Sequence, residues 1–124
     1  MSDLERNKRS VVEFYELAFN KTEPEQAVQK YVGSRYIQHN PQAPDGPEAF
    51  IGFVRAFPEA SVEIRRVIAD DDIVVTHSLI KFTADDERGT VAADIFRLED
   101  GKIVEHWDVL QPFPEESANP HPMF

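Results

Sequence analysis

The sequence predicts one domain of the α+β class, in which helices from the first half of the chain cover a curved antiparallel sheet from the second half. Apolar residues recur at helical spacing up to about residue 57, and from residue 62 they alternate with the period of two that strands have. Short turns rich in Asp and Gly separate the β-prone segments, which is typical of an antiparallel meander. We expect residues 1–124 to form this single domain, with residues 111–124 as an extended tail.

Three helices are expected in the first half of the chain. The first begins at Asp3, a suitable N-cap, and continues to about residue 20. The second begins in the capping-box segment Thr22–Glu25 and is closed by Gly33. The third is capped by Asp45, ends before Pro58 and carries a row of phenylalanines. We assign this row to the core, because aromatic side chains at helical spacing usually face it.

The second half of the chain predicts four strands, over residues 62–68, 73–82, 90–98 and 102–110. Asp70–Asp72 and Asp85–Gly89 are predicted turns, and Glu99–Gly101 is a predicted tight hairpin. A further extended segment, Arg35–Asn40, precedes the third helix, and the sequence assigns it no place in the sheet.

Composition excludes several classes of function. The net charge of −10 argues against a nucleic-acid partner, because phosphate binding needs clustered Lys and Arg. The absence of cysteine excludes disulfides, thiol nucleophiles and cysteine-based zinc sites, and no glycine-rich phosphate loop is present. The sequence has neither an apolar run of membrane-spanning length nor an apolar N-terminal leader. We therefore expect a cytoplasmic protein with no cofactor and no membrane partner.

Asp94 is the first candidate for a functional residue. It lies in the middle of a predicted strand whose two faces are both apolar, so its carboxyl group has no polar face to occupy. A buried carboxylate must be paired, hydrogen-bonded or protonated. A carboxylic acid held in a pocket suits acid–base catalysis, and a structural Asp bonded to a neighbouring Arg, Tyr or His is the alternative.

His77 is the second candidate. It shares a face of the preceding strand with Ile73, Val75 and Leu79. Because consecutive strands of a meander pair, we expect His77 and Asp94 to lie side by side on the concave face of the sheet. A His–Asp pair of this kind can move a proton, and a core histidine without a catalytic role is the alternative.

The last strand carries further polar candidates on both of its faces. His106 and Asp108 share one face, and Trp107 lies on the other. Alternation alone does not decide which face lines the interior. Three histidines, His39, His77 and His106, could in principle hold a zinc ion, but none of them lies in a short ligand motif, so no metal is expected.

The order of the elements and three segments resemble one known family. The segments are Tyr36–Pro41, the hairpin that joins Asp94–Arg97 to Asp100–Asp108, and the tail Gln111–Asn119. They are similar to the SnoaL-like proteins of the NTF2-like superfamily, and the tail resembles the subgroup labelled predicted SnoaL-like aldol-condensation catalysts. The resemblance covers the whole chain. It implies an NTF2-like cone with an internal pocket, and a homodimer formed through the outer face of the sheet.

The resemblance also implies roles for particular residues. Asp94 matches the acid–base Asp of the polyketide cyclases, with His77 on the strand before it. Tyr15 and Asp94 match the tyrosine and acid of the ketosteroid isomerases. Asp108 matches the catalytic acid that ends the last strand of the limonene epoxide hydrolases. This chain departs from the isomerases at Asn40, where their base is an Asp, and from the epoxide hydrolases at His77, where they have an Asp.

Two functions of different class follow. In the first, the protein is a cofactor-free acid/base enzyme of the cyclase, aldolase or isomerase type that enolises a small, partly hydrophobic carbonyl compound. Asp94 and His77 are its expected catalytic residues. In the second, it is a non-catalytic ligand-binding NTF2-like dimer. The residues expected to contact the ligand in either case are Tyr15, Gln38, His39, Asn40, His106, Trp107 and Asp108.

Overall fold

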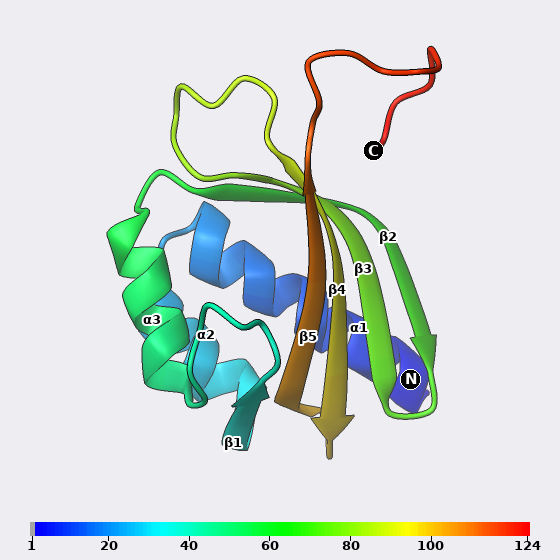
Figure 1. The fold of residues 1–124 in the computed structure, drawn as a ribbon. Helices are drawn as coiled ribbons and strands as arrows, with labels where there is room; N and C mark the ends of the chain where they lie inside the picture. Colours follow the sequence, from blue (N-terminus) through cyan, green and yellow to red (C-terminus); the bar gives the residue numbers. More distant parts are fainter. Residues whose placement is uncertain (1) are drawn as a thin grey trace.

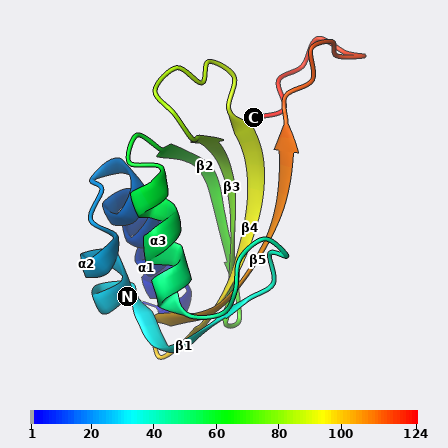
Figure 2. The ribbon, with the colours of Figure 1, turned by 60° about the vertical axis from the view of Figure 1, so that its left-hand side comes forward.

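The computed structural model describes residues 2–124 and shows a curved five-stranded sheet with helices on its concave side (Figures 1 and 2). The α+β class predicted from the sequence is confirmed. The helical elements in order are α1 (Asp3–Tyr15), the π-helical turn η1 (Glu16–Asn20), α2 (Pro24–Tyr31) and α3 (Pro47–Ala56). The strands are β1 (Val32–Gln38), β2 (Ser61–Asp70), β3 (Ile73–Lys81), β4 (Thr90–Glu99) and β5 (Lys102–Pro112).

The helix predicted from Asp3 to about residue 20 is present as α1 followed by η1, but its cap and its last turn differ from the prediction. Ser2, and not Asp3, is its N-cap, since the Ser2 hydroxyl accepts a hydrogen bond from the backbone N–H of Glu5 at 3.2 Å. At the other end the helix widens into the π turn η1, which the sequence did not predict. Such turns often occur at functional sites, and this one directly follows Tyr15.

The caps predicted for the other two helices are wrong. The N-cap of α2 is Glu23, and that of α3 is Gly46, neither with a side-chain cap bond. A proline in the first turn is common to both helices, and its fixed φ favours a helix start. Asp45 instead accepts a hydrogen bond from the backbone N–H of Gln38 at 2.8 Å.

Gly33 lies in β1 and does not close α2, which ends at Tyr31. A Cβ at position 33 would lie 2.9 Å from Cγ1 of Val104 on β5, so the two strands approach closely here only because this residue is a glycine.

The sheet has the strand order β1-β5-β4-β3-β2. Strands β2 to β5 form the predicted antiparallel meander. The extended segment predicted over Arg35–Asn40 overlaps β1, which begins earlier, at Val32, and pairs in parallel with β5. This pairing sets Gln38 beside His106 and closes one edge of the cone.

The core lies between the helices and the concave face of the sheet. Among its members, Phe14, Val54, Phe96 and Ile103 are almost completely buried. The phenylalanines of α3 divide: Phe50 packs against the core, whereas Phe53 and Phe57 are 40% and 36% exposed. The prediction that this row packs in the core therefore holds for Phe50 and only in part for Phe53 and Phe57.

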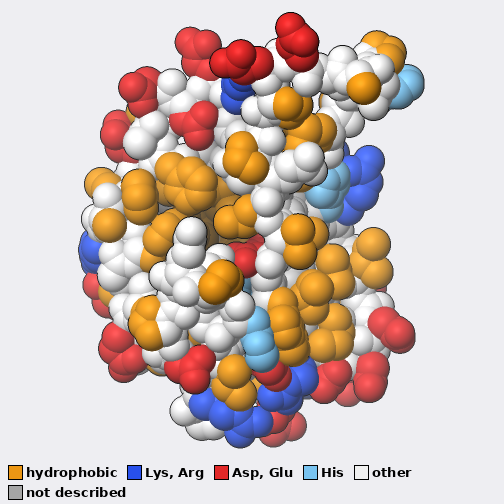
Figure 3. Space-filling model, in the orientation of Figure 1, with side chains coloured by type: hydrophobic (Ala, Val, Ile, Leu, Met, Phe, Trp, Pro, Cys, Tyr) orange, Lys and Arg blue, Asp and Glu red, His pale blue; other side chains and the backbone are white. Residues whose placement is uncertain are grey.

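The outer face of the sheet is rich in apolar side chains. Ile68 on β2 and Val109 on β5 are 62% and 68% exposed. Figure 3 shows hydrophobic side chains gathered over the strands right of centre. Within residues 2–124, no helix combines the length and the hydropathy that crossing a membrane requires.

Candidate functional site

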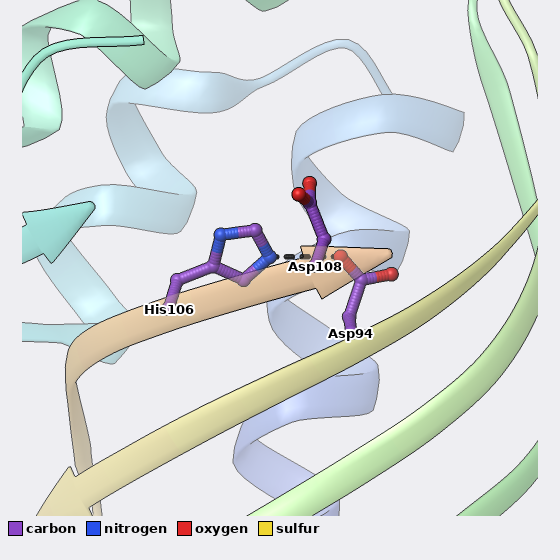
Figure 4. Close-up of side chains that lie close together, drawn as sticks. All are labelled: Asp94, His106 and Asp108. Atoms are coloured by element: carbon purple, nitrogen blue, oxygen red, sulfur yellow. Dashed lines mark hydrogen bonds and ion pairs between the residues drawn. The ribbon is translucent and has the colours of Figure 1, made fainter. Parts of the chain in front are cut away.

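The candidate site lies on the concave face of β4 and β5. Asp94 and Asp108 are direct cross-strand partners, and His106 lies two residues before Asp108 on the same face. Asp94 is 1% exposed and His106 4% exposed. The structure therefore decides what alternation left open: His106 and Asp108 face inward, and Figure 4 shows them grouped with Asp94.

One carboxylate oxygen of Asp94 joins α1 to β5. The Tyr15 hydroxyl donates to Asp94 Oδ1 at 2.9 Å, and His106 Nε2 lies 2.8 Å from the same oxygen. Burial, followed by the negative charge of Asp94, raises the pKa of Tyr15 well above its usual value. Tyr15 thus keeps its proton at neutral pH and acts as a donor.

The other nitrogen of the imidazole is bonded as well. His106 Nδ1 lies 2.8 Å from Gln38 Oε1, at the end of β1. The Tyr36 ring stacks against the imidazole, with centroids 6.2 Å apart and planes 13° apart. Burial also raises the pKa of Tyr36, with the charges of Asp94 and Asp108 as further causes. The imidazole is therefore fixed on three sides.

Asp108 is the accessible acid of the group. It is only partly buried, and Asn40 Nδ2 donates to both of its oxygens, at 2.9 and 3.1 Å. Figure 3 shows a hollow bordered by hydrophobic side chains, with an acidic group at its floor. Asp108 therefore keeps some accessible surface, whereas Asp94 is 1% exposed.

The structure does not bring His39, His77 and His106 together: His39 stacks on Trp107, His77 lies near Phe124 and His106 contacts Asp94. The group that can offer three ligand atoms, within residues 2–124, is Asp94, His106 and Asp108, whose atoms lie within 4.8 Å of one another. Asp94 Oδ1 and His106 Nε2 are directed at each other in a hydrogen bond, so this geometry is that of a proton-sharing pair.

The predicted placement of His77 beside Asp94 is wrong. In the register of β3 and β4, the partner of Asp94 is Thr76, and His77 faces Ala93 on the outer side of the sheet. A pairing of neighbouring strands does not ensure a common face, because successive residues alternate. The Nδ1 atom of His77 accepts a hydrogen bond from Arg66 at 2.8 Å, and its ring lies near that of Phe124 in the tail, with centroids 5.6 Å apart.

His39 and Trp107 also lie away from Asp94. Trp107 pairs with Ile95 on the outer face, and the His39 ring stacks on it with centroids 4.6 Å apart and planes 5° apart. His39 Nε2 donates to Glu105 at 2.7 Å, and this bond is the first cause that lowers the pKa of Glu105. The predicted contact of His39 and Trp107 with an interior ligand is not supported by this placement.

Two hydroxyls of β3 were missed as part of the site. Within the described part of the chain, Thr76 Oγ1, Ser78 Oγ and Asp94 Oδ2 are buried and make no hydrogen bond to protein. The signal was present in the sequence, because Thr76 and Ser78 alternate with His77 and so had to face inward once His77 faced outward. Together they surround Asp94 with buried polar groups.

A separate depression of about 310 Å³ lies between α1 and β2. It reaches the site only at Tyr15, and its other polar groups, Glu16, Asn20 and Glu63, belong to the surface. We therefore assign the chemistry to the group of Asp94, His106 and Asp108 and not to this groove.

Comparison with known proteins identifies the fold and the family model that fits the chain. The model of the SnoaL-like domain matches residues 11–106, which is well over half of the sequence. No curated protein sequence matches the chain.

Several solved structures have the same fold. A candidate polyketide cyclase from Acidithiobacillus ferrooxidans has a TM-score of 0.73 at 19% identity, with 89% of this chain and 91% of that chain covered. A candidate ketosteroid isomerase from Kribbella flavida has a TM-score of 0.73 at 14% identity, with 98% and 87% covered. A candidate SnoaL-like polyketide cyclase from a Jannaschia species has a TM-score of 0.67 at 20% identity, with 89% of each chain covered. At these identities the likeness shows the fold alone.

Proposed function

The chain belongs to the family of SnoaL-like domains, and on that premise we propose that it is a cofactor-free acid–base enzyme that enolises a small carbonyl compound. The observation that carries the proposal is the buried Tyr15–Asp94–His106 hydrogen-bonded group, with the partly exposed Asp108 beside it (Figure 4). Figure 3 shows a hollow bordered by hydrophobic side chains, which suits a partly hydrophobic substrate. Cyclisation, aldol addition and isomerisation share such an enolising first step.

Asp108 is the proposed base. It is the member of the group that is only partly buried, and the bonds from Asn40 hold its carboxylate in one orientation. A base of this kind acts only if its oxygen can approach the proton that it removes. In the isomerases that the sequence resembles, the base occupies the position of Asn40. In this chain an amide stands there and holds a carboxylate that comes from β5.

The Asp94–His106 pair is the proposed acid. It shares a proton between Oδ1 and Nε2, which lie 2.8 Å apart, and Tyr15 donates to the same oxygen. When Asp108 takes a proton from the α-carbon, the C–H electron pair moves toward the carbonyl and the carbonyl oxygen becomes negative. This step requires the bound substrate to place that oxygen within hydrogen-bond distance of Asp94 or His106, and the pair then delivers its proton to it, so the charge is neutralised as it develops.

Solvent exchange tests this function without knowledge of the natural substrate. In deuterated buffer, the wild-type protein is expected to speed up loss of the α-protons of at least one probe among phenylacetone, beta-tetralone and ethyl acetoacetate, followed by proton NMR. Asp108→Asn should slow this exchange about a hundredfold, as loss of a general base typically does.

Asp85→Asn is the matched control, because Asp85 lies exposed in the turn between β3 and β4. It should exchange the probes as fast as the wild type. Equal rates for the wild type and Asp108→Asn with every probe would contradict the assignment of Asp108 as base.

A specific observation favours a second function, that of a non-catalytic ligand-binding protein. Asp94 Oδ2 and the hydroxyls of Thr76 and Ser78 are enclosed on all sides, so part of the polar floor has a packing role. In this function Asp94 joins α1 to the sheet, and the hollow binds a ligand without converting it. Binding of a probe to the wild type, detected by quenching of tyrosine and tryptophan fluorescence, without any exchange would favour this function.

The outer face of the sheet is the proposed surface for a homodimer. Its exposed apolar residues at both margins, Ile68 and Val109, enclose half-buried ones on the strands between them. A second copy of the chain would cover the whole face, as the family resemblance implies.

Charge on this face should dissociate the dimer. We expect the wild type to show twice the monomer mass of 14.2 kDa in light scattering after gel filtration, and Ile68→Glu or Val109→Glu to show the monomer mass. Leu4→Glu is the control, because Leu4 is 39% exposed on α1, away from the sheet's outer face. A wild-type monomer, or a dimer dissociated equally by Leu4→Glu, would argue against this interface.

A further inference from the structure

Three hydrogen bonds converge on one oxygen atom of Gln38. The backbone N–H groups of His39 and Asn40 both donate to Oε1 at 3.1 Å, and His106 Nδ1 lies 2.8 Å from it. The two ends of a glutamine amide are distinguished by their partners. Because a backbone N–H can only donate, the end of the Gln38 amide that meets two of them must be the oxygen.

The orientation of the amide determines which nitrogen of His106 carries a proton. An amide oxygen only accepts hydrogen bonds, so His106 Nδ1 must be the donor toward Gln38. A neutral imidazole has one N–H and one bare nitrogen. In the neutral ring, Nε2 is therefore bare, and it faces Asp94 Oδ1 at 2.8 Å.

We propose that Gln38 is a positioning residue that holds the His106 proton on Nδ1 and so reserves Nε2, beside Asp94, for gaining and losing a proton. The inference rests on the proposed acid–base function and assigns it a specific atom. With Nδ1 occupied, one proton lies between Nε2 and Oδ1, and it belongs either to the carboxyl group or to the ring. The pair can then give this proton up and take it back.

The opposite tautomer would prevent this exchange. With its only proton on Nε2, the neutral ring would donate permanently to Asp94, and the bare nitrogen would point toward Gln38 and away from the substrate. A proton delivered to the substrate could not be regained through Nε2. By fixing the tautomer of His106, Gln38 allows the Asp94–His106 pair to exchange a proton. In the other tautomer the pair would form only a structural hydrogen bond.

The fold holds Gln38 in place for this role. It is the last residue of β1, its register partner on β5 is His106, and its own N–H is held by Asp45. The backbone turn after β1 brings the N–H groups of His39 and Asn40 onto Oε1. Neither group depends on a ligand, so the amide is oriented before any substrate enters.

Nitrogen NMR of the imidazole rings tests the inference directly, since the two tautomers differ in the shifts of Nδ1 and Nε2. The ring of His106 is assigned by the loss of its signals in His106→Gln. At a pH where the ring is neutral, the wild type should show the proton on Nδ1. Gln38→Leu should move the population toward Nε2, and Gln38→Glu, which keeps the acceptor, should restore Nδ1.

Gln42→Leu is the matched control, because Gln42 is exposed in the same loop and its side chain makes no bond among the described residues. It should leave the His106 signals unchanged. A wild-type ring with its proton on Nε2 would overturn the inference, as would an unchanged tautomer in folded Gln38→Leu. If Gln38→Leu does not fold, the wild-type spectrum and Gln38→Glu still decide the question.

Exchange kinetics separate this inference from the proposed function. Relative to wild type, Gln38→Leu should slow α-proton exchange of the responsive probe roughly tenfold or more, because the wrong tautomer disables the relay. A wild-type protein that exchanges no probe but carries the His106 proton on Nδ1 would contradict the proposed function and still support the tautomer assignment. Full exchange by a Gln38→Leu variant with a changed tautomer would overturn the role of Gln38 alone.

Discussion

Replacement of Phe96 by alanine is expected to lower the free energy of unfolding by about 3–5 kcal/mol. Phe96 has no exposed surface and packs its ring against Tyr15 and His106, with centroids 5.3 and 5.0 Å away. Removing the ring leaves a cavity that the curved sheet cannot close by collapsing. Urea unfolding followed by circular dichroism measures this loss.

Phe53→Ala is the matched control for Phe96→Ala. It removes the same ring from a site that is 40% exposed, so less apolar surface returns to water and a smaller cavity remains. We expect less than half of the loss in this variant. Similar losses at the two positions would mean that the core is not centred on the site.

Asp94→Ala is expected to destabilise the protein by a similar amount, about 3–5 kcal/mol, for a different reason. The variant leaves the Tyr15 hydroxyl and His106 Nε2 buried without their common partner. Asp94→Asn should lose markedly less, because its amide has the same shape and can still bond to both groups. Chemical unfolding of both variants at neutral pH measures the difference.

Asp70→Ala provides the baseline for this comparison, since Asp70 is exposed at the end of β2. Its stability should stay within about 0.5 kcal/mol of the wild type. If Asp94→Ala were as stable as Asp70→Ala, the hydrogen bonds of Asp94 to Tyr15 and His106 would not be what holds α1 to the sheet. In that case the role of Asp94 would have to be sought in catalysis alone.

The class of fold could be predicted from the sequence because it depends on local signals. The change of period near residue 60 and the turns at Asp71 and Gly101 reflect backbone preferences that each segment carries by itself. The parallel pairing of β1 with β5 could not be predicted in this way, because its hydrogen bonds join segments that no local pattern connects. Gly33 shows the difficulty: the residue that looked like a helix terminator is needed for contact with β5.

Single members of the site could be predicted, but not which of them meet. The burial of Asp94 could be predicted because both faces of its strand are apolar. Tyr15 and His106 were also among the residues expected to contact a ligand. The partner of Asp94 depends on strand register, and a shift of one residue exchanges Thr76 for His77. The His106–Gln38 contact depends on the parallel pairing, so it was beyond sequence reasoning for the same reason.

The parallel pairing of β1 with β5 also determines when the molecule can assemble. Tyr15 and Asp94 are 79 residues apart, and Gln38 and His106 are 68 apart. Contacts between such distant segments form slowly, because the intervening chain must be ordered first. During synthesis β1 emerges early and has no neighbour in the sheet until β5 follows. The acid–base group is therefore among the last parts of the molecule to form, and a chain that ends before β5 cannot contain it.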